Sequence, residues 1–258
     1  MSIPDALVSS LVDGPSIVTA VQWHERCEST NSLVLAAAGA GAAEGLLVLA
    51  DEQSAGRGRH GRSWSAPAGS SLLLSLLVRP VVPPASLSLL PLLTGLVLAK
   101  TMARHLPDVD VGLKWPNDLL VGGRKAAGIL VEGAAGAAVV GVGINVDWRG
   151  VDRPAELDGA VSLAEAAGHD VDRWRLLAGV LGVFSRRYDQ WQELPAAFLD
   201  GYRQRSATLG QVVRVTLLDG GQVQGEAIDV DRNGALVVST PTGAVTISAG
   251  DVEHVRPA

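Results

Sequence analysis

Short apolar runs bounded by glycine, proline or polar residues dominate the first half of the chain. Runs of this length and composition predict buried β-strands. The predicted strands cover residues 18–23, 46–50, 70–78, 111–115, 127–132 and 139–146. Tight turns separate them, and the Gly122–Gly123 pair predicts a hairpin. This succession predicts an α+β fold, with a mixed, mostly antiparallel sheet and helices on one side of it.

Helical spacing of apolar residues appears in a few longer segments. An alanine-rich helix is predicted after Ser29 and Thr30, either of which is a good N-cap. Capping explains these hydroxyl groups by default, although the free N–H groups of a helix start also suit a ligand. The sequence Ser162-Leu-Ala-Glu165 is a capping box. Further helices are predicted over 87–106, 172–192 and 194–202.

The pattern changes again near residue 209, where short alternating segments are separated by glycine turns. They predict strands at 211–218, 222–230, 236–239 and 245–248. About 50 residues of this kind predict a small β-barrel. We therefore expect two domains, residues 1–206 and residues 207–258.

Composition narrows the class of protein. The chain has 258 residues, 47% of them hydrophobic, which is ample for a core. Its single cysteine, Cys27, excludes an internal disulfide, suits a reducing cytoplasm and is expected to be a buried bystander. No secretory signal is visible, and the apolar stretch 87–99 is too short for a membrane span. Scattered histidines argue against structural zinc.

One loop carries most of the candidate chemistry. Residues 51–64 read DEQSAGRGRHGRSW, so glycines alternate with Arg57, Arg59 and Arg62 after a buried strand. Glycine lets a ligand approach the backbone, and arginine binds carboxylate or phosphate through forked donors. The alternatives are an ordinary solvated loop and a nucleic-acid contact, but the chain has a net charge of −6. A basic island in an acidic chain favours a small anionic ligand.

Two further polar sites lie on either side of the predicted hairpin. Asp118 and Lys125 are close enough in sequence for their side chains to meet. If the loop binds phosphates, Asp118 is a candidate ligand for Mg²⁺. The simpler alternatives are a turn-capping role for Asn117 and Asp118 and a solvated edge position for Lys125.

Four motifs then resemble one family closely. They are GRGRHGRSW (56–64), KWPND (114–118), KAAGILVE (125–132) and GVGIN (141–145), and they resemble biotin protein ligases in order and approximate spacing. The resemblance covers about residues 20–150 strongly and the C-terminal barrel weakly. It implies the class II synthetase-like biotin–lipoate ligase fold with an SH3-like C-terminal barrel.

The resemblance also implies a reaction and a set of site residues. Biotin is activated with ATP and Mg²⁺ to biotinyl-5′-adenylate and is then transferred to a lysine of the biotin carboxyl carrier domain of acyl-CoA carboxylases. Lys125, Arg57 and Asp118 are the implied catalytic residues, and Asp118 is also the implied Mg²⁺ ligand. The implied biotin site contains Ser29, Thr30, Asn31, Gln53, Gly56, Arg57, Lys125, Gly128 and Ile129. The implied ATP and adenylate site contains Arg59, Arg62, Trp64, Lys114, Asn117 and Asn145.

Some expectations separate this chain from related proteins. Residues 1–20 are too few and too weakly periodic for a DNA-binding domain, so a monofunctional ligase is expected, without nucleic-acid or membrane partners. His60 stands where the family often has another arginine. A monomer or weak homodimer is expected. The alternative is a lipoate or octanoate ligase, or a transferase, of the same fold.

Overall fold

The computed structural model describes residues 2–134 and 136–255. Its larger part is built on a seven-stranded sheet with the order β1-β2-β3-β7-β6-β5-β4, in which only β1 and β2 pair in parallel. The strands are β1 (Ala20–Cys27), β2 (Leu46–Gln53), β3 (Ser71–Val78), β4 (Val111–Lys114), β5 (Asp118–Val121), β6 (Arg124–Ala134) and β7 (Ala137–Asn145). The predicted mixed, mostly antiparallel sheet is confirmed.

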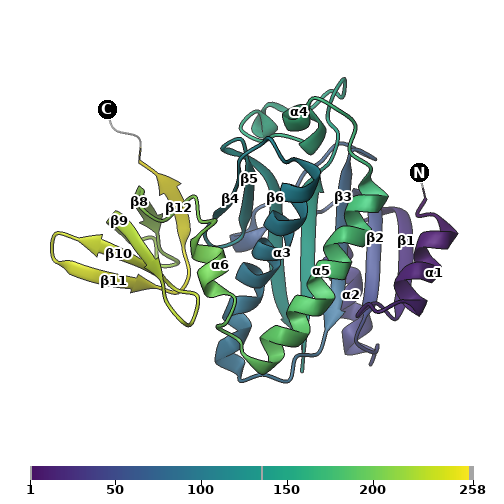
Figure 1. The fold of residues 1–258 in the computed structure, drawn as a ribbon, viewed down its shortest axis with the longest axis horizontal. Coiled ribbons are helices and arrows are strands. Elements are labelled where there is room, and N and C mark those ends of the chain that lie inside the picture. The colour runs from purple at the N-terminus through teal and green to yellow at the C-terminus, as the bar shows by residue number, and fades with distance from the viewer. Residues whose placement is uncertain (1, 135, 256–258) are drawn as a thin grey trace.

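Helices cover both faces of this sheet, so the prediction of helices on one side was wrong (Figure 1). On one face lies α2 (Thr30–Gly39), which packs on β2, β3, β6 and β7. On the other face α3 (Leu90–His105) and α5 (Arg173–Glu193) pack on each other and on the sheet. Each face of the sheet has its own hydrophobic core, and the side chains of β2 alternate between them. Leu47 and Leu49 belong to the core under α3, and Leu46 and Val48 belong to the core under α2.

Smaller helices complete this part of the molecule. They are α1 (Asp5–Asp13), α4 (Leu163–Ala167) and α6 (Leu199–Arg203). The α4 helix begins with the predicted capping box between Ser162 and Glu165. The α1 helix contacts β1 and α5 and was not predicted, because its nine residues carry only weak periodicity.

The C-terminal strands form a second, five-stranded antiparallel sheet with the order β11-β10-β9-β8-β12. Figure 1 shows it beside α6 at one end of the molecule. The strands are β8 (Val212–Thr216), β9 (Gln222–Val230), β10 (Leu236–Thr240), β11 (Gly243–Ile247) and β12 (Asp251–His254). Four of them were predicted, and the short β12 was not.

One apolar helical segment in the described residues passes a length and composition test for crossing a membrane. It covers Pro84–His105 and has a mean hydropathy of 1.5. The sequence analysis judged residues 87–99 too short to span a membrane, but the helical segment that contains them is long enough. Burial explains the segment instead, because 67% of its apolar window lies inside the protein, as in a core helix.

Candidate active site

A cavity of about 130 Å³ opens on the α2 face of the large sheet. The start of α2, the end of β2, the basic loop and the middle of β6 and β7 all meet there. Most residues implied by the sequence motifs line it. They are Ser29, Thr30, Asn31, Gln53, Arg57, Arg59, Arg62, Trp64, Asn117, Lys125, Gly128 and Ile129. The structure thus brings together segments more than 100 residues apart in the chain, from Ser29 to Gly143.

Glycines on β6 and β7 make the floor of this cavity flat. A Cβ atom on Gly128 or Gly143 would lie 2.6 or 2.4 Å from the Trp64 ring. A Cβ atom on Gly141 would lie 2.0 Å from Asn31 Oδ1. These separations are too short for any side chain. The missing side chains therefore let the indole and the amide lie directly on the sheet.

A hydrogen-bond chain fixes the neutral polar wall. Gln53 Oε1 accepts from the Thr30 N–H at 2.7 Å, and it lies 3.0 Å from Thr30 Oγ1. Ser75, which no sequence motif singled out, donates to Asn31 Oδ1. Ser29 is the N-cap residue of α2, as predicted, but its side chain makes no cap bond. The first N–H of the helix, from Thr30, donates to Gln53 Oε1. This wall presents both donors and acceptors to a ligand.

Lys125 and Asp118 form the ion pair that the hairpin predicted. Lys125 Nζ lies 2.8 Å from Asp118 Oδ1, and their side chains are 40% and 19% exposed. The same ammonium lies 5.5 Å from the centre of the Trp64 ring, within reach of a cation–π interaction. Lys125 is therefore oriented at the cavity and is not a solvated edge residue.

Glu132 is a site residue that the sequence analysis missed. Its Oε2 atom accepts from Arg57 Nη2 at 2.6 Å and from Asn31 Nδ2 at 2.8 Å. One carboxylate oxygen thus joins the basic loop to the start of α2. The only signal in the sequence was an acidic residue at the end of the 125–132 motif.

The basic loop is folded back on itself over the cavity. The Trp64 N–H donates to the Gly56 carbonyl at 2.8 Å, and the Gly58 N–H donates to the Arg62 carbonyl at 2.7 Å. Gly56 does not line the cavity. A Cβ atom there would lie 2.4 Å from Trp64 O, so this glycine closes the loop. His60 has a φ of 55°, a left-handed backbone unusual for a side-chain-bearing residue.

Two arginines of the loop reach the C-terminal sheet. Arg59 Nη1 lies 3.3 Å from the Gly250 carbonyl and 3.4 Å from Asn117 Oδ1. Burial lowers the pKa of the Arg59 guanidinium, and the nearby Asp251 carboxylate opposes that shift. Arg62 Nη2 pairs with Asp251 Oδ1 at 2.6 Å. The C-terminal sheet therefore helps to hold the loop over the cavity.

Asp251→Ala tests this contact. The substitution removes the carboxylate partner of Arg62, so we expect trypsin to cut the loop near Arg62 faster, by about tenfold or less, since exposed pairs contribute about 1 kcal/mol or less. Limited digestion followed by mass spectrometry measures the cutting rate, and Glu253→Ala, on the same strand and paired only weakly with Arg214 at 4.0 Å, is the control. Equal cutting rates for both variants would show that the contact does not hold the loop.

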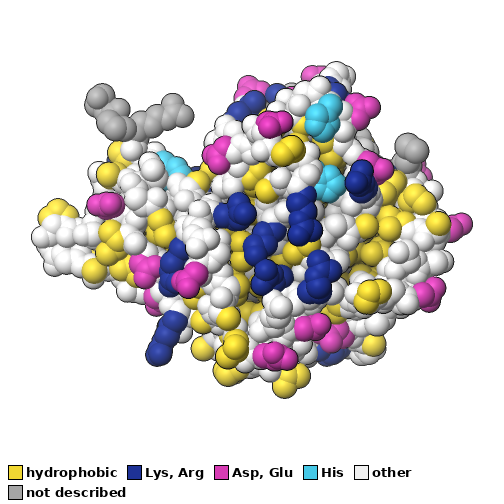
Figure 2. Space-filling view, viewed as in Figure 1, with side chains coloured by type: hydrophobic (Ala, Val, Ile, Leu, Met, Phe, Trp, Pro, Cys, Tyr) yellow, Lys and Arg dark blue, Asp and Glu magenta, His cyan; other side chains and the backbone are white. Residues whose placement is uncertain are grey.

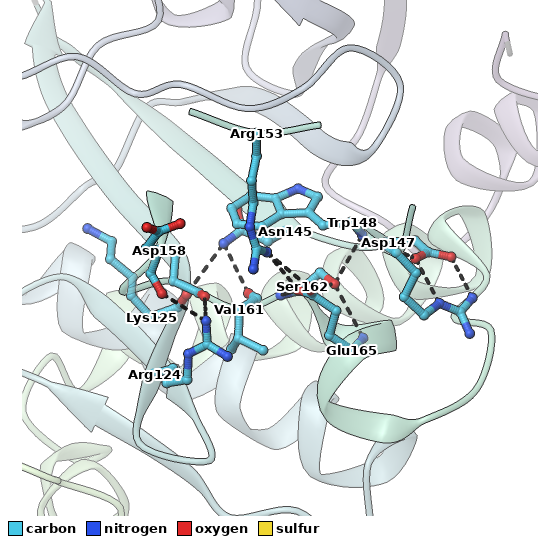
Figure 3. A network of polar contacts seen from close by, with 12 residues as sticks. Arg124, Lys125, Asn145, Asp147, Trp148, Arg153, Asp158, Val161, Ser162 and Glu165 are labelled. Atoms are coloured by element: carbon cyan, nitrogen blue, oxygen red, sulfur yellow. Dashed lines mark hydrogen bonds and ion pairs between the residues drawn. The ribbon is translucent and has the colours of Figure 1, made fainter. Parts of the chain in front are cut away.

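Asn145 lies behind Lys125 and is held by the segment that follows β7. Its Nδ2 atom donates to the Val161 carbonyl at 3.1 Å and to the Lys125 carbonyl at 3.4 Å. Figure 3 shows this network and, next to it, the Ser162–Glu165 capping box with Arg153. Asn145 Oδ1 and Trp64 Nε1 are buried without a hydrogen-bond partner among the described residues. Trp64 lines the cavity, so its Nε1 atom is a free donor there, whereas Asn145 is not among the lining residues.

Two assignments find less support in the geometry. Lys114 pairs with Asp118 across the β4–β5 ladder but is not among the residues that line the cavity. Its charge instead contributes, after burial, to a lowered pKa of His254 on β12. The described residues contain no group of three or more His, Cys, Asp or Glu side chains that could hold a metal ion. Asp118, the implied metal ligand, is therefore not part of such a group.

Comparison with known proteins agrees with this geometry. Residues 23–148 match the biotin/lipoate A/B protein ligase family, and residues 208–255 match the biotin protein ligase C-terminal domain. A biotin–[acetyl-CoA-carboxylase] ligase of Mycobacterium tuberculosis is 41% identical over 88% of this chain and 86% of that protein. The chain belongs to the biotin protein ligase family. The bifunctional ligase/repressor BirA of Bacillus subtilis is 33% identical over 90% of this chain and 73% of its own length.

Solved structures of biotin protein ligases have the same fold. The enzyme of Aquifex aeolicus in complex with biotin and ATP superposes with a TM-score of 0.81 at 28% identity, covering 93% of this chain and all of that one. The lipoate alternative is not favoured, because the relatives named above are biotin ligases.

Proposed function

We propose that this protein joins biotin to ATP, forming biotinyl-5′-adenylate and pyrophosphate, and then transfers biotin to a lysine of a carboxylase carrier domain. One observation carries the proposal. The same cavity places neutral donors and acceptors, Thr30 and Gln53, beside the cations Arg57 and Lys125. Biotin has this polarity, with a neutral ureido ring at one end and a carboxylate at the other.

The ureido ring is placed against the start of α2. It has one carbonyl acceptor and two N–H donors, which match hydroxyl and amide groups. Because Gln53 Oε1 is already held by Thr30, the Gln53 NH₂ group is the part of this side chain that is left to act as a donor. Gly128 and Ile129 provide close backbone approach and an apolar wall for the thiophane ring and valeryl chain.

The first reaction joins two anions. A biotin carboxylate oxygen forms a bond to the α-phosphorus of ATP while the bond to the β-phosphate breaks and pyrophosphate leaves. Lys125, Arg57, Arg59 and Arg62 offset the repulsion, and preorganised charges are worth most where negative charge develops. Trp64, Asn117 and Asn145 are placed on the adenylate side, where the unpartnered Asn145 Oδ1 and Trp64 Nε1 atoms suit the nucleotide.

Magnesium is proposed to act through the nucleotide phosphates. One carboxylate is sufficient for such a site, since Mg²⁺ retains waters and binds substrate phosphates. Asp118 is the carboxylate available in the cavity region, and Lys125 already occupies its Oδ1 atom. When bound, the ion would neutralise phosphate charge.

In the second reaction the carrier lysine attacks the acyl carbon of the adenylate and AMP leaves. The attacking amine must lose a proton to become nucleophilic and a second one afterwards. Asp118 is the proposed acceptor at the site, because its carboxylate lies beside the Lys125 ammonium that would hold the departing phosphate.

The proposal is tested by incubating a purified carrier domain with this protein, biotin and Mg-ATP. We expect mass spectrometry to show the addition of one biotinyl group to one lysine. Parallel reactions with lipoate or octanoate provide the control. Acylation by either of these, with none by biotin, would reassign the substrate.

Loop movement gives a separate prediction. The glycines and like charges of residues 54–64 resist packing, so the loop should open in the free enzyme and close over the adenylate. Limited trypsin digestion should cut near Arg57–Arg62 in the free protein and several-fold more slowly with biotin and ATP. Equal cleavage in both states would show that residues 54–64 do not close over the ligands.

The remaining assignments are proposals of the same kind. We place the domain boundary at residue 206, which lies between α6 and β8 and is supported by the separate C-terminal sheet. The C-terminal match at residues 208–255 supports an SH3-like barrel for those strands. A cytoplasmic location and a monomer or weak homodimer remain predictions.

A further inference from the structure

A group of unpaired cations lies on the face of the molecule opposite the cavity. Figure 2 shows Lys and Arg side chains gathered over α3 and α5, near the centre of that face. We define the basic face by five residues from three segments of the chain. They are Lys100, Arg104, Arg175, Arg187 and Arg205.

Among the described residues, no carboxylate pairs with a cation of the basic face. Most arginines in this acidic chain pair with a carboxylate or a backbone carbonyl, as Arg57, Arg62 and Arg203 do. Within residues 2–134 and 136–255, none of the five cations has a carboxylate oxygen within 4 Å among the ion pairs found. Arg187 donates only to the neutral Gln190 amide, at 2.9 Å.

These cations repel one another. Burial lowers the pKa of Lys100, and the charges of Arg187, Arg205 and Arg104 lower it further. Lys100 and Arg104 are also four residues apart on α3, a like-charge spacing that destabilises a helix. This repulsion costs stability, and the ion pairs found among the described residues do not offset it.

One end of the basic face is concave. A cavity of about 600 Å³ there is lined by Arg104, His105 and Arg175. Two carboxylates also line it, but each is occupied: Asp172 caps α5 and Asp170 pairs with Arg149 at 2.5 Å. The arginines therefore remain available to an external anion.

We propose that the basic face binds a partner protein through a short segment rich in Asp and Glu. Carboxylates on such a segment would pair with the five cations, and one would enter the concave end. Nucleic acid fits less well, because the rest of the chain is more acidic than its net charge of −6 and would repel a long polyanion. The proposal does not depend on the biotin reaction, which uses the other face of the sheet.

The test measures binding of a fluorescein-labelled polyglutamate peptide to the full-length protein by anisotropy, at low and physiological salt. We expect salt-sensitive binding that weakens about tenfold in K100E/R104E. The matched control R214E/R232E changes the net charge equally, on the C-terminal part, and should bind like the wild type. Tighter binding of duplex DNA than of peptide, absence of peptide binding at low salt, or equal loss in both variants would each overturn the proposal.

A stability measurement separates a functional surface from a structural one. K100Q/R104Q relieves repulsion, so its melting temperature should equal that of the wild type or rise by about 1 °C, while peptide binding weakens severalfold, less than in K100E/R104E. A clear fall in melting temperature would mean that the cations stabilise the fold, and would contradict the proposal. Biotin-dependent pyrophosphate exchange, measured in parallel, should be unchanged in all of these variants; its absence in the wild type would instead count against the ligase function.

Discussion

Lys125→Ala is expected to lower the rate of biotin-dependent ATP–pyrophosphate exchange by about 10²- to 10³-fold, the usual effect of removing one electrostatic contact to a transition state. The lost ammonium is the cation at the centre of the cavity, paired with Asp118 at 2.8 Å and lying over the Trp64 ring. Its loss also leaves the Asp118 carboxylate unpaired beside an incoming anion. Repulsion then replaces attraction where the two substrates meet.

Lys100→Ala is the matched control for this loss. It removes the same type of side chain from α3, on the other face of the sheet, and should leave pyrophosphate exchange unchanged. Transfer from chemically made biotinyl-5′-adenylate to the carrier domain should also fall in Lys125→Ala, because the same ammonium faces the departing AMP. If the exchange rate of Lys125→Ala lies within a few fold of the wild-type rate, Lys125 is a solvated residue without a part in the reaction.

The local sequence was sufficient to predict a contact where only a short turn separates the two residues. Asp118 and Lys125 are separated by one hairpin, and Gly122 and Gly123 both have the positive φ angles that such a turn requires. The ion pair followed from that geometry. The capping box at Ser162 and Glu165 was predicted for the same reason, since its partners are three residues apart.

Contacts between distant segments could not be read in this way. Glu132 meets Arg57 across 75 residues, and Asp251 meets Arg62 across 189. Their pairing depends on how whole elements pack, and no local pattern encodes it. The start of α2 illustrates the same limit, because its first N–H, from Thr30, donates to Gln53 on another strand.

The sequence did contain a signal against the prediction of helices on one side of the sheet. Strands that are half exposed alternate polar and apolar residues, whereas strands covered on both faces are apolar throughout. The run Leu72–Val78 contains one polar residue, Ser75, and every residue of β3 is buried. This pattern favours helices on both faces of the sheet, as α2, α3 and α5 show.

Gly143→Ala is expected to impair biotin binding and adenylate formation together. A methyl group there would lie 2.4 Å from Cε2 of Trp64. The indole ring is rigid, so no part of it can rotate away to relieve this clash. The indole must move away from the sheet, which shifts one wall of the site and the loop that carries it. Displacements of about 1 Å at an active site lower activity by about 10²-fold. Overpacking should also cost about 1–3 kcal/mol in the free energy of unfolding.

Gly133→Ala distinguishes loss of the site from a general effect of replacing glycine in a strand. Gly133 lies on β6, and a Cβ atom there would meet nothing within 4 Å. This variant should retain wild-type activity and a melting temperature within about 2 °C of the wild type. Biotin titration by calorimetry, pyrophosphate exchange and thermal unfolding should be compared for the two variants. If Gly143→Ala binds biotin as tightly as Gly133→Ala, Trp64 does not need to lie flat on β7, and the close approach between them has no part in holding the substrate.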